Sequence, residues 1–371
     1  MTYKVPFVDF PAHYHNLESE IMTTVKDIFT NGDYILRDQL KQFERNVASF
    51  LGVDYAVGVN SGTDALFLSL LAVGIGRDDE VITVAHTFVA TVAAIIHCGA
   101  TPVLVDVGKD FNMDTEKLEA AITPRTKAII PVHLNGRLCH MERLMNIARK
   151  HNLTVIEDAA QALGASFDCR KAGAFGHTGC FSFYPAKILG TPGDGGLIST
   201  NDEVIANRIR TVRDNGRVMG QDEVVCYGFN SRLDNLHAAI LNVKLKYLPR
   251  WIIRRREIAA IYEQGLSDLP QIKLPLAPGV DSKFYDAYQN YVIRSTERDR
   301  LVSYLRENGV EILISWLIPM HHQKALNLGH FALPETERIS KEVISLPMYP
   351  ELSNEKAEYV IKSIHQFHLT R

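Results

Sequence analysis

Cys180-Phe-Ser-Phe-Tyr-Pro-Ala-Lys187-Ile-Leu-Gly190-Thr-Pro-Gly193-Asp194-Gly195-Gly196 places a lysine between an aromatic segment and a run of glycines. Aromatic surroundings favour the neutral, nucleophilic form of an amine, because burial disfavours the charged form. The glycines permit backbone turns that a side chain would block. Such a lysine suits a Schiff base with a carbonyl cofactor, but a lysine in a surface loop can have the same local pattern. Residues elsewhere in the chain decide between the two.

A carboxylate follows the strand-like residues 153–157, Leu-Thr-Val-Ile-Glu, at Asp158. The carboxyl edge of a parallel sheet is where α/β proteins bind ligands. Pyridoxal phosphate needs a carboxylate beside its pyridine nitrogen, since that partner keeps the nitrogen protonated and lets the ring accept electrons. Asp158 is the candidate for this partner. The alternative is that Asp158 caps a helix that begins at Ala159.

A candidate phosphate site lies where the strand-like residues 55–60 run through Ser61-Gly62-Thr63 into the apolar helical run that begins at Asp64. Helix N-termini present free N–H groups and a positive dipole end, and small residues let the backbone approach an anion. A plain helix cap would have the same sequence. Further on, Phe88 could lie flat on a cofactor ring or belong to the core.

Short sequence blocks over nearly the whole chain share their order with one protein family. They are residues 8–10, 31–36, 60–63, 87–91, 131–134, 157–161, 181–187 and 228–233. In this order and spacing they resemble the DegT/DnrJ/EryC1/StrS sugar aminotransferases, which are fold-type I pyridoxal phosphate enzymes. The resemblance implies a large cofactor-binding α/β domain and a smaller C-terminal α+β domain.

The resemblance also implies catalytic roles. Lys187 would form the Schiff base and later move a proton between cofactor and substrate. Asp158 would hold the pyridinium, and Gln161, one helical turn on, would hydrogen-bond the ring hydroxyl. Some members of the family carry His in place of this lysine and remove a hydroxyl group instead. Because this chain has Lys187, it is expected to transaminate.

Cofactor binding and assembly follow from the same resemblance. Gly62, Thr63 and Ser182 would hold the phosphate, and Phe88 would stack on the ring. In the family, an Asn in the segment that matches residues 228–232 reaches the cofactor phosphate of the neighbouring subunit. Asn230 therefore implies a homodimer with shared active sites.

Alternating strand-like and helical runs support the α/β fold class. Strands are expected near residues 80–84, 101–106, 127–132, 153–157 and 196–200, in a mainly parallel sheet flanked by helices. From Arg232 to about Tyr262 the pattern is helical and is interrupted by Pro249. We expect strands near 291–294 and 310–314, and helices near 298–308 and 353–367. The predicted domains are 1–245 and 246–371.

Composition fits an ordinary globular enzyme, with 46% hydrophobic residues and a net charge of −3. The one basic run, residues 250–256, is expected to be a solvated helix face, so no nucleic-acid partner is predicted. No apolar stretch of membrane-spanning length and no signal peptide is apparent, which favours the cytoplasm. Five cysteines without C-x-x-C spacing argue against disulfides and zinc ribbons. His321, His322 and His330 lack a H-E-x-x-H motif, so no metal is expected.

The acceptor implied by the resemblance is a nucleotide-linked keto-deoxysugar, with L-glutamate as amino donor. Tyr184, Trp316 and His321 are the residues expected to touch substrate. The segment 313–323 is similar to enzymes that act at C3 of dTDP-3-keto-6-deoxyhexoses, but Ser315, Trp316 and Leu317 stand where those enzymes have His-Tyr-Pro, and His322 stands for a leucine. A 4-aminotransferase, a keto-cyclitol aminotransferase and a cofactor-bound regulatory protein therefore stay open.

Overall fold

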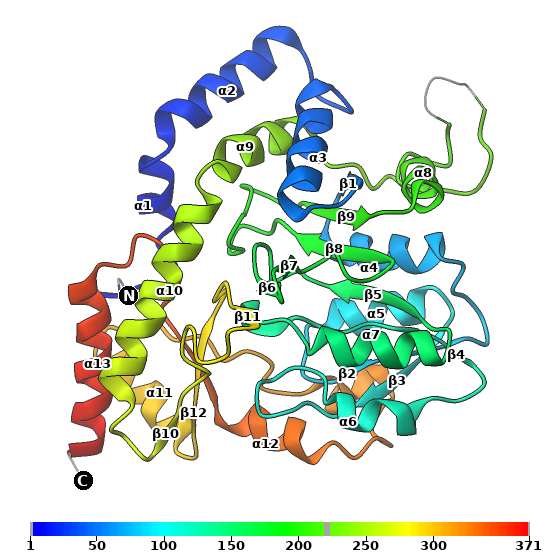
Figure 1. The fold of residues 1–371 in the computed structure, drawn as a ribbon. Helices are drawn as coiled ribbons and strands as arrows, with labels where there is room; N and C mark the ends of the chain where they lie inside the picture. Colours follow the sequence, from blue (N-terminus) through cyan, green and yellow to red (C-terminus); the bar gives the residue numbers. More distant parts are fainter. Residues whose placement is uncertain (1–2, 219–222, 370–371) are drawn as a thin grey trace.

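The computed structural model describes residues 3–218 and 223–369, and a seven-stranded sheet lies at its centre (Figure 1). Only β9 runs antiparallel to its neighbours, as the mainly parallel prediction requires. The strand order is β1 (Tyr55–Val59), β9 (Gly196–Thr200), β8 (Thr178–Ser182), β5 (Thr154–Asp158), β4 (Thr126–Ile129), β2 (Glu80–Val84) and β3 (Thr101–Val105).

Both faces of the sheet are buried, so successive strand residues alternate between two cores. Val57 and Ile156 pack with residues of α4 (Gly62–Ala72), α5 (Val89–His97) and α8 (Glu203–Val212). Ala56 and Val155 pack with residues of α3 (Asp38–Leu51), α7 (Met141–Lys150) and α9 (Asn235–Leu245). In Figure 1, α4 and α5 lie behind the sheet and α7 lies in front of it. This two-sided cover explains the near-continuous apolar runs of the sequence.

The C-terminal part has a smaller antiparallel sheet and its own core. Its strands are β10 (Ile272–Lys273), β12 (Tyr291–Ser295) and β13 (Val343–Leu346), in that order. Helices α10 (Leu248–Leu266), α11 (Arg298–Glu307) and α13 (Asn354–Leu369) pack around them. Figure 1 shows this part beside the large sheet, at the lower left. The predicted C-terminal α+β unit is confirmed.

The prediction of a strand at residues 310–314 was wrong. Val310 forms an isolated bridge to Val5, and Leu313 forms another to Ser345. Because the segment pairs at two separate points with two partners, no continuous ladder forms. The strand that completes the small sheet is β13, which the sequence analysis did not assign.

The remaining elements connect these two parts. Helices α1 (Phe10–His15) and α2 (Glu18–Asn31) precede the large sheet, α6 (Thr115–Leu118) follows β3, and α12 (Pro334–Glu342) precedes β13. A small sheet joins β11 (Phe284–Tyr285), β6 (Ser166–Phe167) and β7 (Arg170–Lys171). The helical pattern does break near Pro249, which lies in the first turn of α10. The predicted boundary after residue 245 falls between α9 and α10, and the division into two domains stays a prediction.

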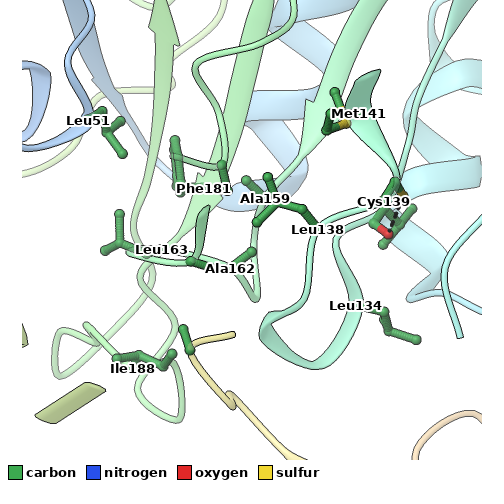
Figure 2. Close-up of a cluster of buried hydrophobic side chains, with 14 of the residues drawn as sticks. Leu51, Leu134, Leu138, Cys139, Met141, Ala159, Ala162, Leu163, Phe181 and Ile188 are labelled. Atoms are coloured by element: carbon green, nitrogen blue, oxygen red, sulfur yellow. Dashed lines mark hydrogen bonds between the residues drawn. The ribbon is translucent and has the colours of Figure 1, made fainter. Parts of the chain in front are cut away.

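An apolar cluster contains residues that flank Asp158 and Lys187 in the sequence. Figure 2 shows Ala159, Ala162, Leu163, Phe181 and Ile188 in this cluster, all buried. Ile188 is the immediate neighbour of Lys187, so its burial anchors the segment that carries the lysine. All five cysteines are free thiols. Among the described helices, none is long and apolar enough to cross a membrane.

Glu157, the residue before Asp158, is fully buried and ties the end of β5 to two loops. Its carboxylate accepts hydrogen bonds from the backbone N–H groups of Gly173 at 2.9 Å, Phe175 at 2.7 Å and Gly176 at 2.7 Å. His133 Nε2 lies 2.9 Å from the same carboxylate. These bonds fix the strand end from which Asp158 projects.

We expect Glu157→Leu to lower the free energy of unfolding by about 3 kcal/mol or more, because three backbone N–H groups lose their acceptor at about 1–3 kcal/mol each. Urea titration followed by circular dichroism measures the change. The control is Glu358→Leu at an exposed position of α13, where a change within about 0.5 kcal/mol is expected. Equal effects of the two substitutions would contradict a structural role for Glu157.

Candidate active site

A cavity of about 510 Å³ lies at the carboxyl edge of the large sheet. Strands β5 and β8 run parallel, and β1 has the same direction as β8 because both are antiparallel to β9. The loops after these strands therefore meet at one edge, as in other open α/β sheets. The predicted site residues that line the cavity are Gly62, Thr63, Phe88, Asp158, Gln161, Ser182, Tyr184, Lys187 and Trp316.

Lys187 lies in an irregular segment after β8, not in a helix or strand. It keeps some accessible surface because it lines the cavity, yet the protein groups around it displace much of its water. Burial lowers the pKa of Lys187 to about 8, while the nearby Asp158 carboxylate acts in the opposite direction. An amine with this pKa is half unprotonated near pH 8. A much larger share of it is therefore available as a nucleophile near neutral pH than for an ordinary lysine.

Asp158 is the last residue of β5 and is buried. Burial raises its pKa, and the hydrogen bond from Thr91 opposes that shift. Thr91 Oγ1 donates to Asp158 Oδ2 at 2.8 Å, and the N–H of Ala160 donates to Oδ1 at 3.3 Å. Thr87 Oγ1 lies 2.8 Å from Thr91 Oγ1. The carboxylate is thus held in one orientation at the floor of the cavity.

The helix expected after Asp158 does not form. The residues after β5 form a hydrogen-bonded turn, in which the N–H of Ala162 donates to the Ala159 carbonyl. The helix-cap alternative for Asp158 was therefore wrong, and Gln161 lies in this turn instead of one helical turn further on. The backbone N–H of Asn135 donates to Gln161 Oε1 at 2.8 Å, which leaves the amide nitrogen of Gln161 as a donor for a ligand.

Helix α4 begins at the cavity, and Ser61 is its N-cap. Ser61 Oγ accepts a hydrogen bond from the N–H of Asp64 at 3.0 Å. The N–H groups of Gly62 and Thr63 belong to the first turn, which has no intrahelical acceptors. A Cβ on Gly62 would lie 2.8 Å from Ser182 Cβ, so a side chain there would fill the space between α4 and β8. The helix cap is thus present, and the predicted phosphate site at Gly62 and Thr63 stays a prediction.

Aromatic side chains form the rim of the cavity. Phe88, the N-cap residue of α5, is 60% exposed although its side chain is apolar, and Tyr184 is also exposed. Trp316 has a left-handed backbone with φ of +56°, which is unusual for a bulky residue. Its ring lies edge-on to His86, with centroids 5.6 Å apart. Because exposed aromatic surface is costly in water, these rings are suited to pack against a ligand.

Two predicted site residues lie outside the cavity. Asn230 is exposed, and it forms an isolated β-bridge with Asp214 shortly after α8. It is not among the residues that line the cavity. His321 is buried, and its Nε2 lies 3.3 Å from Glu337 Oε1, so its predicted contact with substrate has no support from this geometry. The ligand atoms of His321, His322 and Glu337 lie within 4.8 Å of one another. Glu337 Oε1 also accepts from the N–H of Leu333, so hydrogen bonds already use this oxygen.

The threonine that orients Asp158 was not predicted from the sequence. Thr87 and Thr91 were part of a recognised block, but no role was given to either. Their spacing of four residues around the start of α5 was the available signal, because it brings two side chains to one side of a helix. His133 was missed in the same way, and its contact with Glu157 could not be read from local sequence.

The cavity fits pyridoxal phosphate on four structural features. The helix N-terminus next to Gly62 suits a phosphate. Lys187 has the lowered pKa of a nucleophilic amine. Asp158 is a buried carboxylate with no arginine partner among its described contacts. Phe88 offers an exposed aromatic ring among the residues that line the cavity.

Known proteins with similar sequences and structures include sugar aminotransferases. The sequence profile of the DegT/DnrJ/EryC1/StrS aminotransferase family matches residues 15–365. A dTDP-3-amino-3,6-dideoxy-alpha-D-galactopyranose transaminase from Aneurinibacillus thermoaerophilus is 42% identical over 98% of this chain and 99% of its own. A pleiotropic regulatory protein from Geobacillus stearothermophilus is 40% identical over 98% of each chain. The crystal structure of S. venezuelae DesV in complex with ketimine intermediate has a TM-score of 0.95 and 39% identity, with 99% of both chains covered.

We expect Lys187 in cofactor-free protein to react with an amine-acylating reagent with a midpoint near pH 8. Below that pH the amine is protonated and unreactive, and above it the amine is neutral. Asp158→Asn should move the midpoint lower, because it removes the charge that favours the ammonium form. Peptide mass spectrometry at each pH measures the reaction. In urea the midpoint should return to about 10.4, and a native midpoint that equals the unfolded one would contradict the desolvated site.

Proposed function

The chain belongs to the DegT/DnrJ/EryC1/StrS aminotransferase family of pyridoxal phosphate enzymes, and from this premise we propose that its acceptor is a dTDP-3-keto-6-deoxyhexose and its donor L-glutamate. The observation that carries the proposal is the pairing of Lys187 with Asp158 in one aromatic-rimmed cavity. The names of the Aneurinibacillus relative and of other relatives favour amination at C3 of a dTDP-linked sugar.

The protein groups divide the chemistry between them. Bound pyridoxal phosphate supplies an electron sink for the carbon that exchanges its amine. Asp158 would keep the ring nitrogen protonated, and Thr91 keeps Asp158 in place. Lys187 Nζ would hold the cofactor covalently when no amine is bound, and its free amine would carry a proton to and from the reacting carbons. Gly62, Thr63 and Ser182 would bind the phosphate.

Substrate recognition needs more positive charge than the described residues that line the cavity supply. Among the described lining residues, Lys187 is the only cation, and Asp158 and Asp194 are both acidic. A nucleotide diphosphate and the side-chain carboxylate of glutamate both need cationic or N–H partners. We infer that some of these partners come from a second subunit.

Exposed apolar residues next to Asn230 support a homodimer. Tyr227 is 102% exposed, and Val224, Val225 and Phe229 are exposed as well. Apolar side chains gathered in this way on one projecting segment are typical of interaction surfaces. In the proposed dimer this segment crosses to the neighbouring subunit, and Asn230 contacts the cofactor phosphate there.

The alternatives can be separated by the same assay. The name of the Geobacillus relative keeps a regulatory protein open, and a cofactor-bound regulator would give no amino sugar. A 4-keto sugar or a keto-cyclitol as acceptor would give a different product from the same donor.

We expect the protein loaded with pyridoxal phosphate to convert a dTDP-3-keto-6-deoxyhexose to the amino sugar with L-glutamate as donor, as measured by mass spectrometry. A panel with 4-keto nucleotide sugars and a keto-cyclitol serves as comparison. Lys187→Ala should be inactive with every acceptor while it stays folded, because the nucleophile is lost. Turnover of another acceptor but not of the 3-keto sugar would overturn the proposed substrate, and no turnover of any acceptor would overturn the proposed activity.

We expect inactive Lys187→Ala and Asn230→Asp proteins to regain activity when they are mixed under conditions that allow subunit exchange. In a mixed dimer, the site with Lys187 receives an intact Asn230 from its partner. Equal amounts should give at most about one quarter of wild-type activity, from one intact site in half of the dimers. Asn230→Asp alone should bind cofactor weakly, because it puts a like charge beside the phosphate. No recovery after demonstrated exchange would rule out the shared site.

A further inference from the structure

The segment that carries Lys187 has no regular secondary structure, so individual hydrogen bonds must fix its backbone. Within it, the N–H of Lys187 donates to the Tyr184 carbonyl at 2.9 Å. The carbonyl of Gly190 accepts a hydrogen bond from the amine of Lys244 in α9. Neither contact involves the carbonyl of Ala186 or the N–H of Ile188, which lie on the two sides of Lys187. These two groups need partners from another part of the chain.

Gln289 holds both of those peptide groups. Its Oε1 accepts from the N–H of Ile188 at 2.9 Å, and its Nε2 donates to the carbonyl of Ala186 at 2.9 Å. Only this orientation of the amide satisfies both partners, since one is a donor and the other an acceptor. Gln289 is 8% exposed, so water competes little for these bonds. One side chain thus holds the peptide groups on both sides of Lys187.

Gln289 is itself held firmly in the C-terminal unit. It lies between β11 and β12, far along the chain from Lys187. Arg255 of α10 is buried, and its Nη1 donates to the carbonyls of Tyr288 at 3.1 Å, Gln289 at 3.2 Å and Met348 at 2.9 Å. Tyr288 belongs to the core of this unit. The two hydrogen bonds of Gln289 therefore connect the segment of the nucleophile to a part of the C-terminal unit that Arg255 and the core hold in place.

We propose that Gln289 is a positioning residue for Lys187, and that through it the C-terminal unit sets the place of the nucleophile in the cavity. The proposal rests on the proposed function only in that Lys187 is taken as the cofactor-binding lysine. Gln289 is not among the residues that line the cavity, so it acts through the backbone on either side of the lysine. Small rotations at those peptides swing the amine at the end of a long side chain, and a shift of about 1 Å in a reacting group can cost about 100-fold in rate.

The first experiment measures the rate at which added pyridoxal phosphate becomes covalently attached to cofactor-free protein, followed by visible absorbance. Gln289→Leu, which keeps the volume and loses both hydrogen bonds, should slow attachment by about 10-fold or more. It should also speed hydrogen exchange at the N–H of Ile188. In the aminotransferase assay kcat should fall while KM for the acceptor stays constant, because substrate contacts are unchanged.

Tyr288→Phe is the matched control. It removes one hydrogen bond from the neighbouring buried side chain, whose hydroxyl donates to the Leu276 carbonyl at 2.8 Å, and it leaves the Lys187 segment untouched. The thermal stabilities of both variants are measured beside the rates. An attachment rate close to wild type is expected for Tyr288→Phe, even where its loss of stability equals that of Gln289→Leu.

Gln289→Glu should make the two hydrogen bonds to the Lys187 segment depend on pH. A protonated carboxyl group can donate to the Ala186 carbonyl and accept from Ile188 as the amide does, but a carboxylate can only accept. Burial raises the pKa of a carboxyl group, which brings the change into a range that can be measured. The attachment rate of Gln289→Glu, divided by that of wild type at the same pH, should rise as the pH falls. The same ratio for Gln289→Leu should stay flat.

Two results would overturn the proposal. One is an attachment rate of Gln289→Leu equal to that of Tyr288→Phe, and the other is a ratio for Gln289→Glu that does not change with pH. Cofactor attachment needs no sugar substrate, so these results are independent of the acceptor. Failure of the proposed function would show instead as normal attachment in wild type without turnover of any acceptor.

Discussion

The constraint on which the site depends is that an amine must stay neutral beside a carboxylate. Removal of water lowers the pKa of Lys187 and raises that of Asp158, while their mutual attraction opposes both shifts. The hydrogen bond from Thr91 keeps the carboxylate directed into the cavity. When the cofactor is bound, Lys187 would hold it covalently, and Asp158 would keep its ring nitrogen protonated. The sheet, its two cores and the surrounding loops provide the dry and fixed environment that this arrangement needs.

Much of this architecture was predictable because local sequence determines it. The strand ending at Asp158, the helix after Ser61-Gly62-Thr63 and the break at Pro249 follow from apolar runs, small residues and proline chemistry. The lining residues followed from the resemblance, because aligned blocks carry positions that local pattern cannot give. Asp158, Lys187 and Trp316 come from distant parts of the chain, and only the fold brings them to one cavity.

The errors have a common physical origin in long-range contacts. The segment 310–314 has the composition of a strand, but its two pairing points face different partners, Val5 and Ser345. The helix that the alternative interpretation of Asp158 placed at Ala159 is replaced by a turn whose residues pack into the apolar cluster of Figure 2. In each case tertiary packing overrides the local preference, which short windows of sequence cannot report.

The most direct test of the central assignment is to reduce the protein with borohydride in the presence of pyridoxal phosphate and to map the modified peptide by mass spectrometry. Reduction converts the bond between the cofactor and its lysine into a stable amine, so the modified residue is identified without reference to any substrate. We expect the label on Lys187, in about one equivalent per chain. A stoichiometric label on another lysine, or no label on Lys187 under conditions where the protein is yellow, would contradict the assignment of the nucleophile.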